Sequence, residues 1–311
     1  MSRWNTLKRV LTDKDYRTIR LAKVGFYNHL DDRAYIEKIY RAKMGKSLNL
    51  ENPQLFNEKL QWLKLYDRNP LYTQLVDKYR VREYIAEKIG EEYLIPLLGV
   101  WDDPDEIDFD ALPDQFVLKC NHNSGTGMCI CRDKSKLDYD AVRKKLRKGL
   151  QEDFFLKARE WPYKDVPRKI IAEEYMCEAA DIPSDRGLDD YRIYCFNGEP
   201  KLVYMYQSGV LSSGNRPNTV SCDIFDTNWQ HLPVRQKTPN APIEPLPPEG
   251  LCKMLQISRQ LSNGQTFLRV DFYQVNNRVY VGELTIYPGG GFSPFYPIEW
   301  DYTLGEWMKL P

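Results

Sequence analysis

Residues 267–287 read FLRVDFYQVNNRVYVGELTIY, and this stretch decides the fold of the chain. Apolar and polar residues alternate in both of its halves, around a short polar turn, as they do in two paired strands. On the first strand Arg269 and Asp271 share one face, although the rest of the strand is apolar. On the second strand Glu283 and Thr285 point to the same side. The stretch therefore predicts a hairpin with charged side chains on one face.

The length of the turn decides which of these side chains meet. A two-residue turn at residues 276–277 would place Asp271 opposite Gly282, whereas a three-residue loop that includes Arg278 places Asp271 opposite Glu283. Asn tolerates the left-handed conformation that such loops need. We therefore expect the three-residue loop.

This register brings two carboxylates together on neighbouring strands, with Cβ atoms about 5 Å apart. Like charges at that distance are unfavourable unless a cation lies between them, and Mg²⁺ held by one or two carboxylates plus substrate phosphates meets that need. The same register places Arg269 opposite Thr285, and glycines follow at 289–291. These neighbours favour a site over the alternative interpretation, a solvated sheet face with scattered charges.

The composition excludes some classes of function. Charged residues make up 28% of the 311 residues and the net charge is zero, which argues against nucleic acid as the main partner. No apolar run is long enough to span a membrane, and the N-terminus lacks the apolar segment of a signal peptide. Seven Cys without a spacing pattern indicate a reducing compartment. We therefore expect a cytoplasmic protein.

The N-terminal segment is basic. Residues 3–23 hold seven Lys and Arg against Asp13 and Asp15, so a helix there could lie on an anionic membrane surface, at the inner face. A solvated helix face is the alternative.

Cys129 and Cys131 lie near His122, as zinc ligands could, but their spacing fits no common zinc pattern. Alternation places both thiols on one face of a short strand, where small buried side chains are expected.

Helical periodicity divides the chain further. We expect helices over residues 1–66, 74–90, 138–158 and 249–262, and a loop-rich segment over 207–248. Asn52-Pro53 is a plausible helix start, and Lys78 falls inside the second helix. The domains that follow are a helical N-terminal region of residues 1–75 and a second domain of 76–311, the latter divided into subdomains of about 114–175 and 176–311.

A second hairpin carries further candidate chemistry. Residues 116–120 form a strand, 121–127 a loop of small polar residues, and 128–131 the returning strand. Glycines let such a loop fold its N–H groups around a phosphate, and Lys119 can meet the phosphate charge. Other expected strands are 169–172 and a hairpin of 191–196 and 201–206 about Asn197-Gly198.

In this order the chain resembles the ATP-grasp enzymes, and four segments resemble their teichuronopeptide-biosynthesis (TupA-like) branch. The segments are 56–64 (FNEKLQWLK), 77–84 (DKYRVREY), 116–122 (FVLKCNH) and 282–285 (GELT). The resemblance spans roughly residues 50–300. It implies an α+β ATP-grasp fold, in which two subdomains grip ATP, and the cofactors ATP and Mg²⁺.

The resemblance also implies roles for individual residues. Asp271 and Glu283 match the Mg²⁺ ligands, Thr285 falls where many relatives place an Asn ligand, and Arg269 matches the arginine that steadies the acyl-phosphate and tetrahedral oxyanions. The residues matched to ATP are Lys78 and Lys119 for the phosphates, the loop of Asn123, Ser124, Gly125, Thr126 and Gly127 for the flap, and Glu173, Glu174, Tyr175 and Met176 for the hinge at adenine. Candidates for ribose are Glu178 and Asp181, and candidates for substrate are His122, Arg192 and Gly290.

The function that follows is an ATP-dependent carboxylate–amine ligase that works through an acyl phosphate. The family's place in surface-polymer synthesis suggests small-molecule or glycan-linked substrates for a capsule, O-antigen or teichuronopeptide. One alternative is a metal-dependent glycosyltransferase, because Asp103-Pro104-Asp105 and Asp108-Phe109-Asp110 each form an Asp-x-Asp pair. The other is a nucleotide-binding scaffold without turnover, against which the intact carboxylate pair argues.

Overall fold

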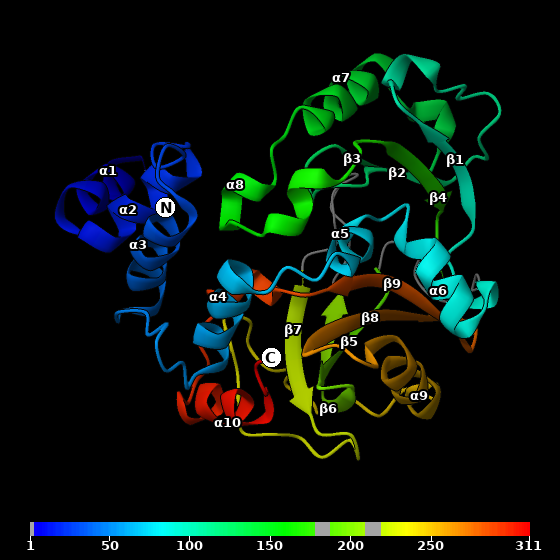
Figure 1. The fold of residues 1–311 in the computed structure, drawn as a ribbon. Coiled ribbons are helices and arrows are strands. Elements are labelled where there is room, and N and C mark those ends of the chain that lie inside the picture. Colours follow the sequence, from blue (N-terminus) through cyan, green and yellow to red (C-terminus); the bar gives the residue numbers. More distant parts are fainter. Residues whose placement is uncertain (1–2, 178–186, 209–218) are drawn as a thin grey trace. The chain divides into compact units, whose positions relative to one another are not determined.

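The computed structural model describes residues 3–177, 187–208 and 219–311, which form an α+β protein (Figure 1). The chain divides into two compact units. The first consists of Met1–Asn69, Asp153–Lys164 and Tyr287–Pro311, and the second of Pro70–Glu152 and Asp165–Ile286. The first unit thus combines most of the N-terminal region with two segments that return from later in the sequence.

The first unit is helical. Its elements are α1 (Arg3–Thr12), α2 (Lys14–Lys23), α3 (Asp32–Met44), α4 (Phe56–Tyr66), α8 (Phe155–Ala158), η5 (Pro288–Gly291) and α10 (Glu299–Trp307), and η4 (Trp161–Asp165) ends at its border. Helices α1, α2 and α3 lie side by side (Figure 1). The helical character predicted for the N-terminal region is confirmed, while α10 was not predicted.

The start of α4 differs from the predicted start at Pro53. The helix begins at Phe56, because the carboxylate of Glu58 accepts hydrogen bonds from the main-chain N–H groups of Gln54 (3.0 Å) and Leu55 (3.2 Å). A glutamate in the first turn therefore satisfies the free N–H groups ahead of the helix. Leu55, the residue before the helix, has extended backbone geometry.

Helix α4 is the centre of the first unit. Its apolar face, with Phe56, Leu60 and Leu63, is buried. Its polar side chains bind main-chain carbonyls: Lys59 donates to Gly305 (2.8 Å) and Met308 (2.7 Å), Gln61 to Gly290 (3.1 Å) and Gly291 (2.5 Å), and Lys64 to Ala158 (2.7 Å) and Gly290 (2.9 Å). One helix thus holds both returning segments of the unit.

The second unit contains a four-stranded antiparallel sheet. Its strands are β1 (Leu97–Trp101), β2 (Phe116–Cys120), β3 (Met128–Cys131) and β4 (Ile170–Glu174), in the order β1-β4-β2-β3. Helix α7 (Tyr139–Leu150) packs on β2 and β3. Cys129 and Cys131 lie in the buried cluster beneath it, and burial raises the pKa of the Cys129 thiol to about 11. The prediction of small buried thiols is confirmed.

A five-stranded sheet completes the second unit. Its strands are β5 (Asp190–Phe196), β6 (Glu199–Ser208), β7 (Thr219–Phe225), β8 (Phe267–Val275) and β9 (Arg278–Thr285), in the order β7-β6-β5-β8-β9. Helix α9 (Leu251–Ser262) packs on β5, β6 and β8. Asn197 and Gly198 both have positive φ, as the predicted tight turn requires. Strand β7 lies in a segment predicted to be loop-rich.

Two predicted long helices are each broken in two. In place of one helix over 74–90 there are α5 (Leu71–Val76) and α6 (Val81–Ile89), separated by a turn. The Asp77 carboxylate holds that turn by accepting from the N–H groups of Tyr79 (2.9 Å) and Arg80 (3.3 Å). In place of one helix over 138–158 there are α7 and α8, which belong to different units.

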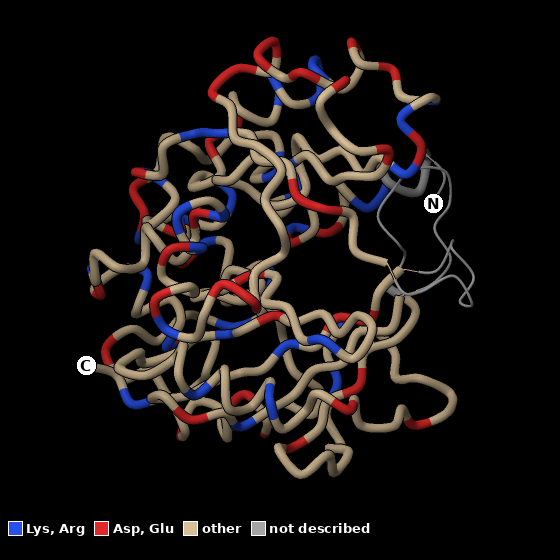
Figure 2. Tube along the Cα trace, turned by 90° about the vertical axis from the view of Figure 1, so that its right-hand side faces the viewer, with Lys and Arg blue, Asp and Glu red and all other residues tan. Residues whose placement is uncertain are grey.

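Charged residues of both signs are interspersed along the chain (Figure 2). The zero net charge is therefore not the sum of one basic half and one acidic half. Among the helices that the structure describes, none has the length and apolar composition needed to cross a bilayer.

Candidate active site

The register of β8 and β9 is the one predicted. Asp271 pairs with Glu283, and Arg269 pairs with Thr285. Residues directly opposite in an antiparallel pair project from the same face of the sheet. The hairpin therefore places two carboxylates and one guanidinium on neighbouring positions of one face.

The turn that connects the strands is shorter than predicted. Val275 pairs with Arg278, so the turn contains only residues 276–277, with φ of 48° and 62°. Such a turn alone would place Asp271 opposite Gly282, and the predicted three-residue loop is therefore wrong. The register is correct for another reason.

A β-bulge at Gly282 restores the register. The pairing shifts by one residue between Asp271 and Phe272, which leaves Gly282 without a partner on β8. A Cβ atom at this position would lie 2.7 Å from the ring of Tyr273, so only glycine fits without a shift. A lone glycine inside an alternating strand is the sequence signal for such a bulge. The bulge turns Glu283 to the face of Asp271.

The Asp271 carboxylate is buried and bound by two guanidinium groups. Arg269 binds it through two nitrogens, with Nε–Oδ1 2.6 Å and Nη2–Oδ2 2.5 Å, and Nε of Arg192 lies 3.6 Å from Oδ2. Burial raises the pKa of Asp271 to about 6, although both arginines oppose that rise. Burial thus favours the neutral carboxyl group, and the two guanidinium groups favour the carboxylate.

The Glu283 carboxylate is more open, with a third of its side chain exposed. Lys78 Nζ lies 3.2 Å from its Oε1, and Arg269 Nη2 lies 3.7 Å from its Oε2. Burial works against ionisation, but the ammonium of Lys78 and the guanidinium of Arg269 outweigh it and lower the pKa of Glu283 to about 2. Glu283 thus stays ionised at any working pH.

Lys78 does not lie in a helix, contrary to the prediction. It occupies the turn between α5 and α6, where its main-chain N–H donates to the carbonyl of Asn121 (3.1 Å). From there Nζ donates to the carbonyl of Asn123 (2.8 Å) while it pairs with Glu283. The broken helix is what allows one ammonium to reach both the β2–β3 loop and the carboxylate on β9.

A buried polar network that was not predicted holds this turn. Asn121 Nδ2 donates to Asp77 Oδ1 (2.8 Å) and to the carbonyl of Pro167 (2.8 Å), and its Oδ1 accepts from the N–H of Lys169 (2.7 Å). Asp77 and Asn121 are both fully buried, and each carries several partners. The network positions Lys78 because it fixes the main chain on either side of it.

The loop between β2 and β3 is tied to the end of α7. Asn123 Nδ2 donates to the carbonyl of Gly149 (3.0 Å), Thr126 Oγ1 donates to Glu152 Oε1 (3.2 Å), and His122 Nε2 lies 3.1 Å from the carbonyl of Glu152. These contacts fix the base of the loop against the last turn of α7 and the residue Glu152 that follows it. His122 is buried there, and burial lowers its pKa.

The tip of this loop is open. Ser124 and Gly125 are exposed, and Gly125 and Gly127 have φ of 86° and 65°. At the base, a Cβ atom on Gly127 would lie 2.7 Å from both Cys120 Sγ and the Cα of Gly149. A loop with a fixed base and an exposed tip of Ser124 and Gly125 fits the predicted phosphate flap.

Lys119 projects from β2 and binds a buried carboxylate. Its Nζ lies 2.5 Å from Glu173 Oε2, and Arg82 Nη1 of α6 lies 3.6 Å from Oε1 of the same residue. Arg82 was not predicted to take part. The Glu173 side chain serves to hold these two cations, and its main chain lies between β1 and β2.

The remaining predicted hinge residues lie at the end of β4. Glu174 is exposed, and the guanidinium of Arg132 lies 5.4 Å from the ring centroid of Tyr175. Glu174 and Tyr175 line an open cavity of about 890 Å³. Met176 is half-buried just beyond the strand. The ribose candidates, Glu178 and Asp181, lie outside the described residues.

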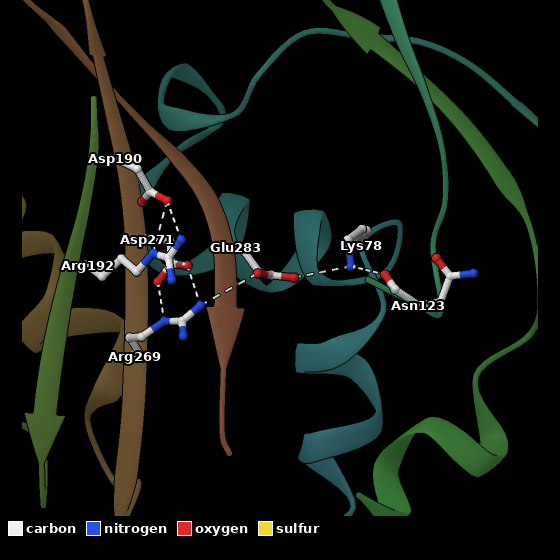
Figure 3. Close-up of polar contacts among 7 residues, drawn as sticks. All are labelled: Lys78, Asn123, Asp190, Arg192, Arg269, Asp271 and Glu283. Atoms are coloured by element: carbon white, nitrogen blue, oxygen red, sulfur yellow. Dashed lines mark hydrogen bonds and ion pairs between the residues drawn. The ribbon is translucent and has the colours of Figure 1, made fainter. Parts of the chain in front are cut away.

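Arg192 extends the site onto β5. It binds Asp190 through Nε (3.0 Å) and Nη2 (2.6 Å), and its guanidinium lies 4.1 Å from the ring centroid of Tyr206. Figure 3 shows one line of alternating charges from Asp190 through Arg192, Asp271, Arg269 and Glu283 to Lys78 and the carbonyl of Asn123. Asp190 was missed, although Asp190-x-Arg192 has the same spacing as Arg269-x-Asp271 on the paired strand.

Gly290, a predicted substrate contact, lies in the first unit. Its φ is 63°, and its carbonyl accepts from Gln61 and Lys64. The neighbouring Gly289 and Gly291 also have positive φ. The carbonyl of Gly290 thus already accepts two hydrogen bonds from α4, and a contact between Gly290 and a substrate stays a prediction.

The residues present fit a magnesium ion shared with phosphates. Among the described residues, no group of three or more His, Cys, Asp and Glu is placed to hold a metal. Asp271 and Glu283 supply two carboxylates, and Thr285 pairs with Arg269 in the same ladder. Mg²⁺ is commonly held by one or two carboxylates plus substrate phosphates rather than by a full protein cage. Asp271 and Glu283 meet that requirement when Arg269 no longer binds the carboxylate oxygens of Asp271.

The Asp-x-Asp pairs lie elsewhere in the second unit. Asp103 Oδ1 accepts from the N–H of Asp105 (2.8 Å), and Asp105 pairs with Arg147 of α7 (2.8 Å). Asp108 Oδ1 likewise accepts from the N–H of Asp110 (3.0 Å). These carboxylates stabilise local turns and the surface of α7.

Several solved structures are similar to this chain. The D-alanine–D-alanine ligase of Bacillus anthracis, complexed with ATP, is 14% identical with a TM-score of 0.39, over 74% of this chain and 58% of that one. The same enzyme of Helicobacter pylori is 15% identical with a TM-score of 0.42, over 82% and 69%. The D-cycloserine synthetase DcsG is 14% identical with a TM-score of 0.41, over 77% and 72%. No curated protein matches the chain.

The family itself is defined by a match over most of the sequence. Residues 58–309 match the family model described as TupA-like ATPgrasp, and the predicted α+β ATP-grasp fold is confirmed. The chain belongs to the TupA-like ATP-grasp family. ATP-grasp ligases use ATP and Mg²⁺, in agreement with the predicted cofactors.

Proposed function

We propose that the protein is an ATP-dependent ligase that joins a carboxylate to an amine through an acyl phosphate. The observation that carries this proposal is the line of alternating charges centred on Asp271, Arg269 and Glu283. Family membership supports ligase chemistry of this kind. The details of residues and substrates below are part of the proposal.

The chemistry needs positioned charge more than a nucleophile. A carboxylate is a poor acyl donor, and transfer of the ATP γ-phosphoryl group to it gives a mixed anhydride that an amine attacks with loss of phosphate. Lys78 and Lys119 would bind the phosphates of ATP, and Arg269 would stabilise the negative oxygens of the acyl phosphate and of the tetrahedral adduct. Mg²⁺ held by Asp271 and Glu283 would neutralise phosphate charge.

The chemical identity of the acid and of the amine is proposed from the family and from the chemistry of the reaction. We propose a small-molecule or glycan-linked carboxylate, such as a sugar uronate or an amino acid, and an amine acceptor, in the synthesis or decoration of a bacterial surface polysaccharide. The reaction would take place in the cytoplasm. If the acceptor is carried on a lipid, it would take place at the inner face of the membrane.

The test is release of ADP from ATP and Mg²⁺ in the presence of panels of uronates and amino acids. Release that requires both an acid and an amine supports the ligase. The Asp271→Asn and Glu283→Gln variants should be inactive, while Glu199→Gln, an exposed carboxylate of the same sheet, should keep full activity. UDP release from a nucleotide sugar with ATP unused, or ATP binding without turnover, would refute the proposal.

A further inference from the structure

The N-terminal helices carry a local excess of positive charge. Residues 8–30 contain six Lys and Arg and two Asp, an excess of four, in a chain whose net charge is zero. Part of this charge is used within the helices, since Arg9 pairs with Asp13 and Arg17 donates to the carbonyls of Val10 and Leu11. Among the described side chains, Arg20 and Lys23 form no ion pair.

The same helices expose large apolar side chains. Leu11 is 70% exposed, Val24 77% and Phe26 59%. The apolar residues that pack inward are different ones, since Tyr27 and Leu30 contact the buried cluster of α3. Helix α2 has no buried residue. Leu11, Val24 and Phe26 therefore form an apolar surface that is separate from the buried cluster of α3.

Charge and apolar surface coincide at the end of α2. Arg20, Lys23 and Val24 have the i, i+3, i+4 spacing that places side chains on one helix face, and Phe26 follows in the next turn. Cations that flank exposed apolar side chains on a helix are typical of helices that lie in the interface of a bilayer. The cations meet anionic headgroups and the apolar side chains enter the acyl boundary.

We propose that α2 and the following turn, residues 14–26, dock the protein on an anionic phospholipid membrane. Charge complementarity favours this partner over a second copy of the chain, because residues 14–26 hold four Lys and Arg against one Asp, and two copies of such a surface repel each other. The inference does not depend on the proposed ligase activity. It concerns the first unit, whereas the candidate active site described above lies in the second.

The test is sedimentation of the full-length protein with vesicles, at low and moderate salt. Vesicles of phosphatidylcholine with phosphatidylglycerol should bind the protein, and vesicles of phosphatidylcholine alone should not. The double variant Arg20→Glu/Lys23→Glu should lower the partition coefficient at least about tenfold, since each cation near an anionic surface contributes appreciably. Val24→Ser/Phe26→Ser should lower it less and should leave the salt dependence intact.

Helix α7 offers a matched control. Lys144 and Lys148 are exposed on a basic helix whose apolar residues Val142 and Leu146 are buried. Lys144→Glu/Lys148→Glu should therefore leave vesicle binding unchanged. Three results would overturn the proposal. The wild-type protein would fail to bind anionic vesicles, the α7 variant would lose vesicle binding as much as the α2 variant, or the protein would sediment without vesicles because it self-associates. Loss of ATP turnover with vesicle binding retained would concern the ligase proposal alone.

Discussion

The cations of helix α4 and the cations of the candidate active site are satisfied in two different ways. On α4 of the first unit, Lys59 and Lys64 donate only to main-chain carbonyls among the contacts described. In the second unit, Lys78, Lys119 and Arg269 are paired with the side-chain carboxylates of Glu283, Glu173 and Asp271. A carbonyl partner belongs to the fold and cannot leave, whereas a carboxylate partner can be exchanged for a phosphate or share a metal.

The difference separates a structural cation from a functional one. Removing one member of a buried pair leaves a charge or a carbonyl without compensation, so both kinds of contact are costly to break. Only the second kind leaves the cation available to a ligand. We therefore expect changes on α4 to alter stability and changes on β8 and β9 to alter activity.

The largest effect is expected at the carboxylate pair. Asp271→Asn or Glu283→Gln should lower the rate of ATP turnover by about 10²–10³-fold or more, because an amide does not supply the negative charge that a metal and its phosphates need. Asp271→Asn should also lower the melting temperature, because it leaves the buried guanidinium of Arg269 without its counter-charge, whereas Glu283→Gln, at a more exposed carboxylate, should change it less. ADP release and thermal unfolding measure the two quantities. An active variant, or one that is inactive because it is unfolded, would break the distinction between the units.

A pH dependence of stability is expected from Lys64. Burial lowers its pKa to about 7, although Glu160 opposes that shift, whereas the unfolded chain has an ordinary lysine pKa of about 10.4. Between these values the unfolded state binds more protons, so the free energy of unfolding should rise with pH by up to about 1.4 kcal/mol per unit. Below about pH 7 this contribution is constant. Lys64→Met should flatten the rise in denaturant titrations, and an unchanged slope would contradict the assignment.

A smaller loss of stability is expected at Gln61. Gln61→Leu removes the donor to the carbonyls of Gly290 and Gly291 and should lower the free energy of unfolding by about 2 kcal/mol. The affinity for ATP should not change. Denaturant unfolding with and without a fluorescent ATP analogue tests both statements, and weaker nucleotide binding at equal stability would give α4 a functional role.

The smallest effect is expected at Lys119. Lys119→Ala should weaken ATP binding about tenfold, because one charge-assisted hydrogen bond to phosphate is lost while Arg82 still compensates Glu173. Titration with the same analogue measures the change. Lys136→Ala, which removes an exposed lysine in an ion pair with Asp133, is the matched control. Equal affinity in the two variants would count against a role for Lys119.

The elements that the sequence predicted well depend on local pattern. The strands of both hairpins follow from alternation, and the turn at Asn197-Gly198 follows from residues that accept positive φ. The pairing of Asp271 with Glu283 was predicted from a three-residue loop that is not present, and the bulge at Gly282 produces the pairing instead; the family resemblance pointed to the same two residues. Each of these features depends only on residues that lie within about ten positions of one another in the sequence.

What was missed depends on contacts between distant residues. The turn at Lys78 is stabilised by Asn121, more than forty residues away, so periodicity alone predicted a continuous helix. The pairing of α4 with the carbonyls of Gly290 and Gly291 spans about 230 residues. Helical spacing identified the apolar face of α4 but has no means of indicating what its polar face binds.

The extra residue at Gly282 has a consequence for how this hairpin tolerates changes in length. Deleting Gly282 would leave the two-residue turn and would keep Glu283 across from Asp271, because the ladder would then run without interruption. If Val281 were deleted instead, the bulge would have to take up the missing residue, and the core contacts of the Val281 side chain would be lost. A one-residue deletion should therefore be harmless at position 282 and harmful at the neighbouring positions of β9.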